Sequence, residues 1–221
     1  IRERRIAADD ETTGDMAIAA ARKALEAGDL KPTDIDAIIV ATTTPDRTFP
    51  SVAAKVQGEL GTGAGIAFDV QAVCSGFIYA LSVADNFIKQ GQAKRILVIG
   101  AEKMSSIVDW TDRATCVLFA DGAGAVIVEA KEDEADHSLK SQGIHSTHLR
   151  ADGSQRDILR TSGGVSTTGD QGYIEMQGRE VFKFAVGYLA EIVKETLEHN
   201  NIQPEEIDWL VPHQANIRII E

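Results

Sequence analysis

The sequence of 221 residues has little cysteine, few aromatic side chains and no long apolar run. Two cysteines, Cys74 and Cys116, cannot build a disulfide framework, which favours a reducing, cytoplasmic location. The longest apolar stretches, such as residues 96–101, are far shorter than the roughly 20 residues that span a bilayer. The charged first residues, IRERRIAADD, are also unlike a secretory signal. We therefore expect neither membrane insertion nor a disulfide-stapled secreted fold.

Basic residues are also in the minority. The chain has 22 Lys and Arg against 34 Asp and Glu, which gives a formal net charge of -12. Proteins that bind a phosphate backbone normally present a basic face, so the charge argues against general nucleic-acid affinity. Any positive surface on this chain is expected to be local.

The pattern of apolar residues predicts an α/β fold. A helix is expected over residues 13–28, capped by Thr12 or Thr13 and stopped by Gly28. Residues 35–42 (IDAIIVAT) have the nearly continuous apolar pattern of a strand that is buried on both faces. Further helices and strands are then expected to alternate: helices at 53–60 and 75–90, strands at 66–70, 95–100, 116–120 and 123–129. A tight turn at Asp121-Gly122 is expected to join the last two strands.

An internal repeat indicates that the chain has two related halves. Residues 25–36 align without a gap with residues 197–208, and five of the twelve pairs are identical. Both copies run into an apolar, strand-like segment, AIIVA and WLVPH. The acidic stretch KEDEADHS is taken as the boundary, which gives a first half at residues 1–131 and the beginning of a second half at residues 132–221. Since little sequence follows the second copy, we expect a chain that is truncated within its second half.

Cys74 is the first candidate for chemistry. It stands between the strand that ends at Val70 and a helix that begins near Ser75. The unpaired N–H groups and macrodipole of a helix N-terminus favour a thiolate, so a lowered thiol pKa is expected there. The backbone N–H of Cys74 could also serve as an oxyanion donor. The alternative is a buried structural cysteine.

His213 is the second candidate. The offset of the repeat places it where the first copy has Ala41, at the carboxyl end of an expected strand. Ligand sites collect at such strand ends in open α/β sheets. If the halves are related by a pseudo-twofold axis, Cys74 and His213 could face each other. The alternative is a histidine that is satisfied by local hydrogen bonds.

The remaining histidines and the second cysteine suggest no site. His145 and His148 have the spacing of a helical metal pair but fall in an expected strand, where positions three apart point to opposite faces. No metal site is therefore predicted. Cys116 is expected in the core, and His137 and His199 on the surface.

Four segments carry a family resemblance that covers essentially the whole chain. DVQAVCSGF, WTDRATCVLFADGAGA, MQGREVFKFAV and DWLVPHQANIRII resemble β-ketoacyl-[acyl-carrier-protein] synthase III, the condensing enzymes that start bacterial type II fatty acid synthesis. The resemblance implies a thiolase fold, which is an internally duplicated, five-layered α-β-α-β-α arrangement, and a homodimer. It also implies condensation of acetyl-coenzyme A with malonyl-acyl carrier protein, without a cofactor or metal.

The resemblance assigns the two candidates their roles. Cys74 matches the nucleophile that accepts the acyl group, and His213 matches the catalytic histidine. The family's catalytic asparagine and its glycine-rich oxyanion segment have no match and would lie beyond Glu221. A tryptophan that holds the coenzyme A adenine would lie before Ile1, so the chain is expected to be truncated at both ends.

Four further residues match the family's substrate-binding positions. Arg113 corresponds to a residue beside the adenine of coenzyme A. Phe182 and Asn216 correspond to positions that line the coenzyme A channel. Phe49 corresponds to a loop residue that reaches the acyl pocket of the partner subunit.

Lys183 and Arg218 match basic residues at the channel mouth that meet the acyl carrier protein. The carrier is acidic, so an enzyme of negative net charge needs a local positive patch to capture it. The alternative for both is ordinary solvated surface. Two other functions stay open: a thiolase-fold ketosynthase or acyltransferase of specialised metabolism, and a catalytically silent homologue that binds acyl carrier protein or coenzyme A.

Overall fold

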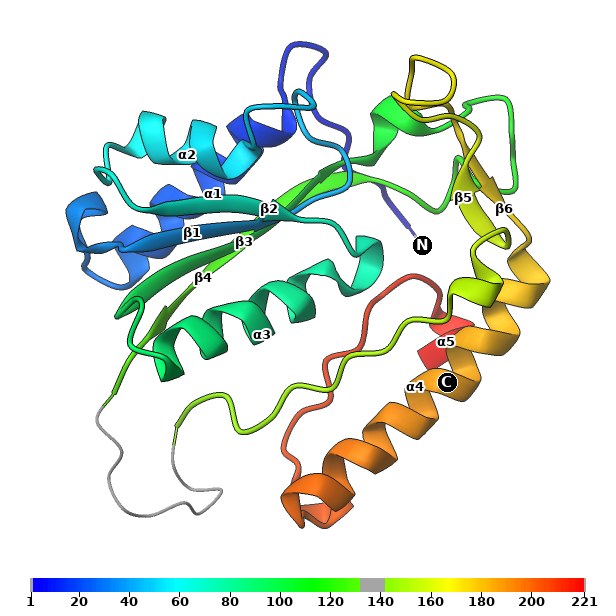
Figure 1. Cartoon of the computed structure of the whole chain (residues 1–221). Coiled ribbons are helices and arrows are strands. Elements are labelled where there is room, and N and C mark those ends of the chain that lie inside the picture. The colour runs from blue at the N-terminus through cyan, green and yellow to red at the C-terminus, as the bar shows by residue number, and fades with distance from the viewer. Residues whose placement is uncertain (1, 132–141, 221) are drawn as a thin grey trace. The chain divides into compact units, whose positions relative to one another are not determined.

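The computed structural model describes residues 2–131 and 142–220, which form two compact units (Figure 1). The first, here called the sheet unit, comprises residues 5–104 and the described part of 120–144. The second, here called the α4 unit, comprises residues 2–4, 105–119 and 145–220. Most of the predicted boundary segment KEDEADHS, with His137, lies outside the described residues, so a division at 131/132 stays a prediction.

A four-stranded sheet forms the centre of the sheet unit, with the strand order β2-β1-β3-β4. β1 (Ala37–Ala41) is parallel to β2 (Ile66–Val70) on one side and to β3 (Arg95–Lys103) on the other. β4 (Asp121–Glu129) is antiparallel to β3. The predicted burial of the β1 segment on both faces is confirmed, because all five of its residues are buried.

Helices cover both faces of this sheet (Figure 1). α1 (Thr13–Ala27) and α2 (Val52–Leu60) pack on one face, and α3 (Gly76–Lys89) packs on the other. The predicted ends of α1 are confirmed: Thr12 and Asp15 form a capping box at its start, and Gly28 closes its end. At the start of α2, the Asp69 carboxylate accepts hydrogen bonds from two backbone N–H groups. Local capping residues therefore fix both ends of α1, whereas the start of α2 is also held by a carboxylate from β2.

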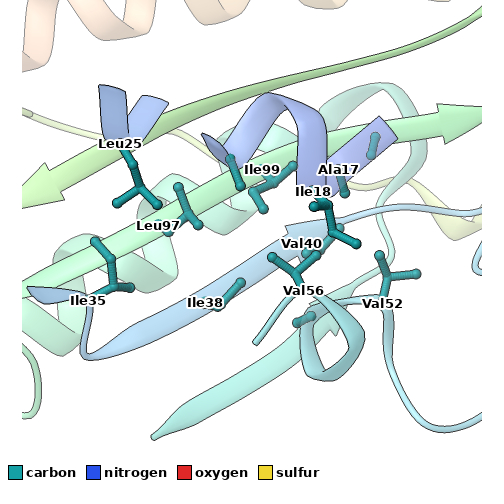
Figure 2. Close-up of a cluster of buried hydrophobic side chains, with 13 residues drawn as sticks. Ala17, Ile18, Leu25, Ile35, Ile38, Val40, Val52, Val56, Leu97 and Ile99 are labelled. Carbon is teal, nitrogen blue, oxygen red and sulfur yellow. The ribbon is translucent and has the colours of Figure 1, made fainter. Parts of the chain in front are cut away.

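Alternation along the strands divides the core into two layers. Ile38, Val40, Leu97 and Ile99 face α1 and α2, as Figure 2 shows. Their sequence neighbours Ala37, Ile39, Ile96 and Val98 pack on the α3 side. Both sets are almost completely buried. This two-sided burial explains why the strands have a continuous apolar pattern rather than an alternating one.

The α4 unit contains a two-stranded antiparallel ribbon, β5 (Leu159–Thr161) with β6 (Ile174–Met176). The long helix α4 (Gly178–Asn200) follows the ribbon, and the short α5 (Ile217–Ile220) ends the described chain. Short 3-10 helices complete the structure: η1 (Pro32–Asp34), η2 (Val73–Ser75), η3 (Met104–Ile107), η4 (Gly153–Gln155) and η5 (Pro204–Glu206). None of the described helices combines the length and apolarity that a membrane crossing requires.

The prediction of two strands joined by a turn at Asp121-Gly122 is wrong. Both residues lie inside the single strand β4, where they pair with Lys103 and Glu102. Residues 113–118 form consecutive turns instead of a strand, because Asp112 accepts hydrogen bonds from the backbone of Ala114 and from the Thr115 hydroxyl. Cys116 lies in these turns and is half-buried, rather than a core strand residue.

The repeat is visible in the structure up to its expected strand. In each copy a helix ends, a residue with positive φ follows, and a 3-10 helix begins with proline. In each copy the residue before the 3-10 helix donates its backbone N–H to a carboxylate at the end of that helix. Lys31 donates to Asp34 and Gln203 donates to Glu206, both at 2.8 Å.

The second copy then departs from the first. β1 is held between two strands, whereas residues 209–213 (WLVPH) pair with no strand in the described part of the chain. The prediction of a strand there is therefore wrong for this structure. Trp209 is 86% exposed and Val211 is 81% exposed. The apolar residues within 209–213 are therefore not covered by a sheet, whereas the matching residues of β1 are buried.

Candidate active site

The Cys74 turn, residues 71–75, lies at the carboxyl ends of the parallel strands of the sheet unit. The chain leaves β2 at Val70, passes through η2 and enters α3 at Gly76. Val73 has a φ of 46°, which is an unfavourable conformation for a β-branched residue. Strained residues of this kind persist where the surrounding structure over-determines them, and they cluster at functional sites. The strain precedes the candidate nucleophile by one residue.

Close packing fixes the start of α3 beside the end of β1. A Cβ atom added at Gly76 would lie 3.2 Å from the Cβ of Ala41. That distance is tighter than ordinary van der Waals contact, so a side chain at position 76 would push the helix away from the strand. The glycine after Ser75 thus allows the Cys74 turn to stay close to the sheet.

Cys74 presents its side chain at the surface of the sheet unit and forms no disulfide. Although it is exposed on one side, burial among the surrounding protein groups raises the pKa of the thiol. A hydrogen bond from its own backbone N–H acts in the opposite direction, and the charge of Glu102 raises the pKa further. The expectation of a lowered pKa is therefore wrong, because desolvation and a neighbouring carboxylate outweigh the donor. The prediction of a cysteine at a helix start is confirmed.

Glu102 is a titratable group near Cys74, at the carboxyl ends of the parallel strands, that was not predicted as a site residue. β3 extends beyond β1, since Gly100 pairs with Ala41, and this overhang carries Glu102 past the end of β1. Its carboxylate accepts hydrogen bonds from residues 42–44, here called the threonine loop. Burial raises the pKa of Glu102, while these donors lower it. A carboxylate at the end of a buried apolar strand was the available signal in the sequence.

A groove of about 440 Å³ in the α4 unit brings together four of the predicted site residues. It lies at the N-terminus of α4 and is lined by Gly178, Arg179, Phe182, Lys183, Asn216 and Arg218. Lys183 is paired with Glu180 at 2.9 Å, and Asn216 accepts a hydrogen bond from the backbone N–H of Arg218 at 3.0 Å. The groove therefore combines an aromatic ring with three cationic side chains, of which Arg179 was not predicted.

The remaining predicted residues lie outside this groove. His213 is exposed in the irregular segment before α5, in the α4 unit, and Cys74 belongs to the sheet unit. Arg113 is exposed on the turns that follow η3 and does not line the groove. Phe49 is 82% exposed on the loop before α2.

A hydrogen-bonded cluster surrounds His148. Its Nδ1 lies 2.8 Å from the Glu195 carboxylate and its Nε2 lies 3.0 Å from the Ser146 hydroxyl. The ring of His199, which is exposed as predicted, meets that of His148 edge to face. The predicted strand through His145 and His148 is wrong, because residues 144–150 form no regular secondary structure and pair with no described strand. No group of metal-ligating side chains occurs among the described residues.

Comparison with known proteins relates both units to one family. Residues 68–153 match the sequence profile of 3-oxoacyl-[acyl-carrier-protein (ACP)] synthase III, and residues 197–221 match the profile of its C-terminal part. Over all 221 residues the chain is 58% identical to the beta-ketoacyl-[acyl-carrier-protein] synthase III of Rhodospirillum centenum, of which it covers 68%.

Solved structures give the same relationship. The 3-oxoacyl-[acyl-carrier-protein] synthase III of Aquifex aeolicus is 50% identical, with a TM-score of 0.90 over the whole chain and 67% of that protein. The corresponding enzyme of Thermus thermophilus is 41% identical, with a TM-score of 0.89 and the same coverage. With its thiolase-like α/β fold, this chain belongs to the β-ketoacyl-[acyl-carrier-protein] synthase III family.

Proposed function

We propose that this protein is an acyltransferase that condenses a short acyl-coenzyme A, normally acetyl-coenzyme A, with malonyl-acyl carrier protein. The product is acetoacetyl-acyl carrier protein, the first intermediate of fatty acid synthesis. The observation that carries this proposal is Cys74, which stands on a strained turn at the start of α3 and at the carboxyl ends of parallel strands. Family membership supplies the reaction class.

In the first step the sulfur of Cys74 attacks the carbonyl carbon of the acetyl thioester. The bond from that carbon to the coenzyme A sulfur breaks, and the Cys74 proton leaves with the released coenzyme A thiol. Because the pKa of Cys74 is raised, the resting group is a thiol, and its proton must be removed as the new bond forms. The backbone N–H of Cys74 is a donor for the oxyanion that develops on the carbonyl oxygen.

In the second step malonyl-acyl carrier protein loses carbon dioxide, and the resulting carbanion attacks the acetyl group on Cys74. The bond to the Cys74 sulfur breaks, and the thiolate regains a proton. Decarboxylation requires hydrogen-bond donors for the oxygen of the thioester enolate, and His213 is assigned that role. This chemistry needs neither a metal nor a cofactor from the chain.

The groove at the N-terminus of α4 is the proposed landing place for the carrier. Lys183 and Arg218, joined by Arg179, give a local positive surface on a chain whose net charge is -12. An acidic carrier protein would be attracted to this surface rather than to the rest of the molecule. Phe182 and Asn216 in the same groove would contact the pantetheine arm, and Arg113 the adenine of coenzyme A.

A homodimer is proposed from the family resemblance, in which Phe49 matches a loop residue that reaches the partner subunit. Phe49 is 82% exposed on its loop, so its ring is accessible to a second subunit. In the proposed dimer Phe49 enters the acyl pocket of the second subunit and sets the acyl length that the enzyme accepts. The absence of a disulfide framework fits a cytoplasmic location.

The test is to incubate the whole protein with acetyl-coenzyme A alone and to map the adduct by peptide mass spectrometry. We expect one acetyl group on Cys74 and none on Cys116, so Cys74→Ala loses the adduct and Cys116→Ala retains it. An acetyl group that persists in Cys74→Ala overturns the assignment of the nucleophile.

The same assay distinguishes two other functions. A longer acyl donor that labels Cys74 where acetyl-coenzyme A does not would indicate a specialised-metabolite ketosynthase or acyltransferase. Binding of coenzyme A or acyl carrier protein by a folded protein that no acyl donor labels would indicate a silent homologue.

A further inference from the structure

The carboxylate of Glu102 holds the threonine loop through several hydrogen bonds at once. One oxygen accepts from the backbone N–H of Thr43 at 2.8 Å. The other accepts from the backbone N–H of Thr44 at 3.1 Å and from its hydroxyl at 2.6 Å. The Thr42 hydroxyl approaches the same oxygen at 3.4 Å. A half-buried carboxylate with this many donors is a rigid anchor, since these donors would lose their acceptor without it.

The threonine loop is tied to its surroundings on two further sides. The Thr44 hydroxyl oxygen accepts from the backbone N–H of Lys103 at 2.8 Å, next to Glu102 in β3. The Thr44 carbonyl accepts from the Thr13 hydroxyl in the first turn of α1 at 2.6 Å. Glu102 therefore fixes a loop that already joins β1, β3 and α1.

One side chain connects this loop to the Cys74 turn. Gln71 stands three residues before Cys74, and its amide nitrogen donates to the Thr43 hydroxyl at 2.9 Å. The backbone N–H of Thr42 also donates to the carbonyl of Val70 at 3.1 Å, which continues the pairing of β1 with β2 up to the turn. A continuous path thus runs from Glu102 through Thr43 and Gln71 to the turn that carries the nucleophile.

We propose that Glu102 is a positioning residue for Cys74, acting through the threonine loop and the side chain of Gln71. The inference rests on the proposed function, because it assigns the path a role in acyl transfer. Glu102 itself touches no reacting atom in this account. Glu102 holds the Cys74 turn in its strained conformation, which includes the positive φ of Val73. The Cys74 sulfur is thereby kept in a fixed orientation toward the acyl carbon.

Three variants test the hydrogen-bonded path, each at one of its residues: Glu102→Gln, Thr43→Val and Gln71→Met. In Glu102→Gln, one acceptor oxygen becomes an NH₂ group that faces a backbone N–H of the threonine loop, so the anchor is broken. Thr43→Val keeps the backbone contact to Glu102 and removes only the acceptor for Gln71. Glu129→Gln is the matched control, because Glu129 pairs with Arg95 at the other end of the β3–β4 ladder.

The measurement is the single-turnover rate of Cys74 acetylation by acetyl-coenzyme A in the whole protein. Small displacements of reacting groups can cost about 100-fold in rate, and we expect a fall of about 10- to 100-fold in each of the three path variants. The half-saturating concentration of acetyl-coenzyme A should stay unchanged, because the path contacts no substrate. Since Gln71 and Glu102 act on one path, the double variant should be no slower than the worse single variant.

Hydrogen exchange of residues 71–75 gives a second readout that does not depend on activity. Exchange should accelerate in the path variants and stay at the wild-type rate in Glu129→Gln. Folded variants with acetylation within about twofold of wild type and unchanged exchange overturn the inference. If Glu102→Gln does not fold, the acetylation rates and the hydrogen exchange of Thr43→Val and Gln71→Met test the inference instead. If the wild-type protein is not acetylated at all, the proposed function fails, and exchange alone decides whether Glu102 holds the turn.

Discussion

Asp29 and Asn201 have nearly the same left-handed backbone conformation, with φ of 50° and 54°. Each follows a long helix in its own copy of the repeat, and each donates its N–H to the corresponding glutamate carbonyl, Glu26 or Glu198, at 3.2 Å. The duplication is therefore preserved in backbone geometry at positions where the residues differ. A short polar side chain is what both copies retain, because Asp and Asn tolerate this region better than other residues with a Cβ atom.

The first prediction concerns this helix stop. Asn201→Ala places an ordinary Cβ atom in the left-handed region and should lower the free energy of unfolding by about 1 kcal/mol. Asn201→Gly, which removes the Cβ atom, should leave it unchanged or raise it by a few tenths of a kcal/mol. Urea denaturation of the two variants measures the difference. Equal stability of the alanine and glycine variants would show that the conformation at residue 201 carries no cost.

The second prediction concerns the start of α1. The Lys55 ammonium, which donates to Asp15 at 2.8 Å, lowers the pKa of that carboxyl to about 2, with help from Thr12. A depressed folded-state pKa gives stability that is present above the ordinary value near 4 and is lost as the pH falls toward 2. Asp15→Asn should therefore lower the free energy of unfolding at pH 7 by about 0.5 kcal/mol, since the pair is partly exposed.

Urea denaturation at several pH values checks this. The difference between Asp15→Asn and wild type should shrink as the pH falls from 5 toward 2. Glu26→Gln, on an exposed position of the same helix, is the control and should show no such trend. A difference for Asp15→Asn that is constant with pH would argue against an ionised Asp15 as the source of stability.

The sheet unit was largely predictable because its signals are local. Apolar runs gave the strands up to β3, and the cap at Thr12 and the stop at Gly28 gave the limits of α1. The error at residues 116–122 has a physical reason. The dipeptide Asp121-Gly122 suggested a tight turn between two strands, but β4 pairs with β3 over nine residues, and that pairing outweighs the local preference.

The site was only partly predictable. The position of Cys74 at a helix start follows from the residues around it, and the groove residues followed from the family resemblance. The raised pKa of Cys74 could not be predicted from its neighbours in the sequence, because it depends on burial and on Glu102, which lies 28 residues further along the chain. The sequence alone does not show that the overhang of β3 brings that carboxylate to the threonine loop.

The third prediction concerns the reactivity of Cys74. The pKa of the thiol is raised by burial and by the charge of Glu102, so alkylation by iodoacetamide should reach half its maximal rate above the ordinary thiol value of about 8.5. Glu102→Gln removes the negative charge and should move that midpoint to lower pH. Thr43→Val keeps the charge and should leave the midpoint where it is. Peptide mass spectrometry of Cys74 over a pH series measures both, and a midpoint that moves to higher pH in Glu102→Gln contradicts the electrostatic account.

The fourth prediction concerns the groove at the N-terminus of α4. Arg218→Glu reverses one of its three cations and should raise the Michaelis constant for malonyl-acyl carrier protein by about tenfold, because it removes an attraction and adds a repulsion. Acetyl transfer from coenzyme A to Cys74 should be spared. Lys194→Glu, on an exposed position of α4 outside this groove, is the matched control. Equal loss of both half-reactions in Arg218→Glu would refute a role limited to the carrier.

The fifth prediction separates the two steps at His213. His213→Ala removes a hydrogen-bond donor for the enolate oxygen, and loss of one such donor typically costs about 100- to 1000-fold in rate. Release of carbon dioxide from malonyl-acyl carrier protein should therefore fall by that amount, while acetylation of Cys74 by acetyl-coenzyme A continues. Radiolabelled carbon dioxide and the mass of the Cys74 peptide measure the two steps in one sample. A His213→Ala protein that is folded but no longer acetylated would instead place His213 in the first step, as the base that takes the proton of a thiol whose pKa is raised.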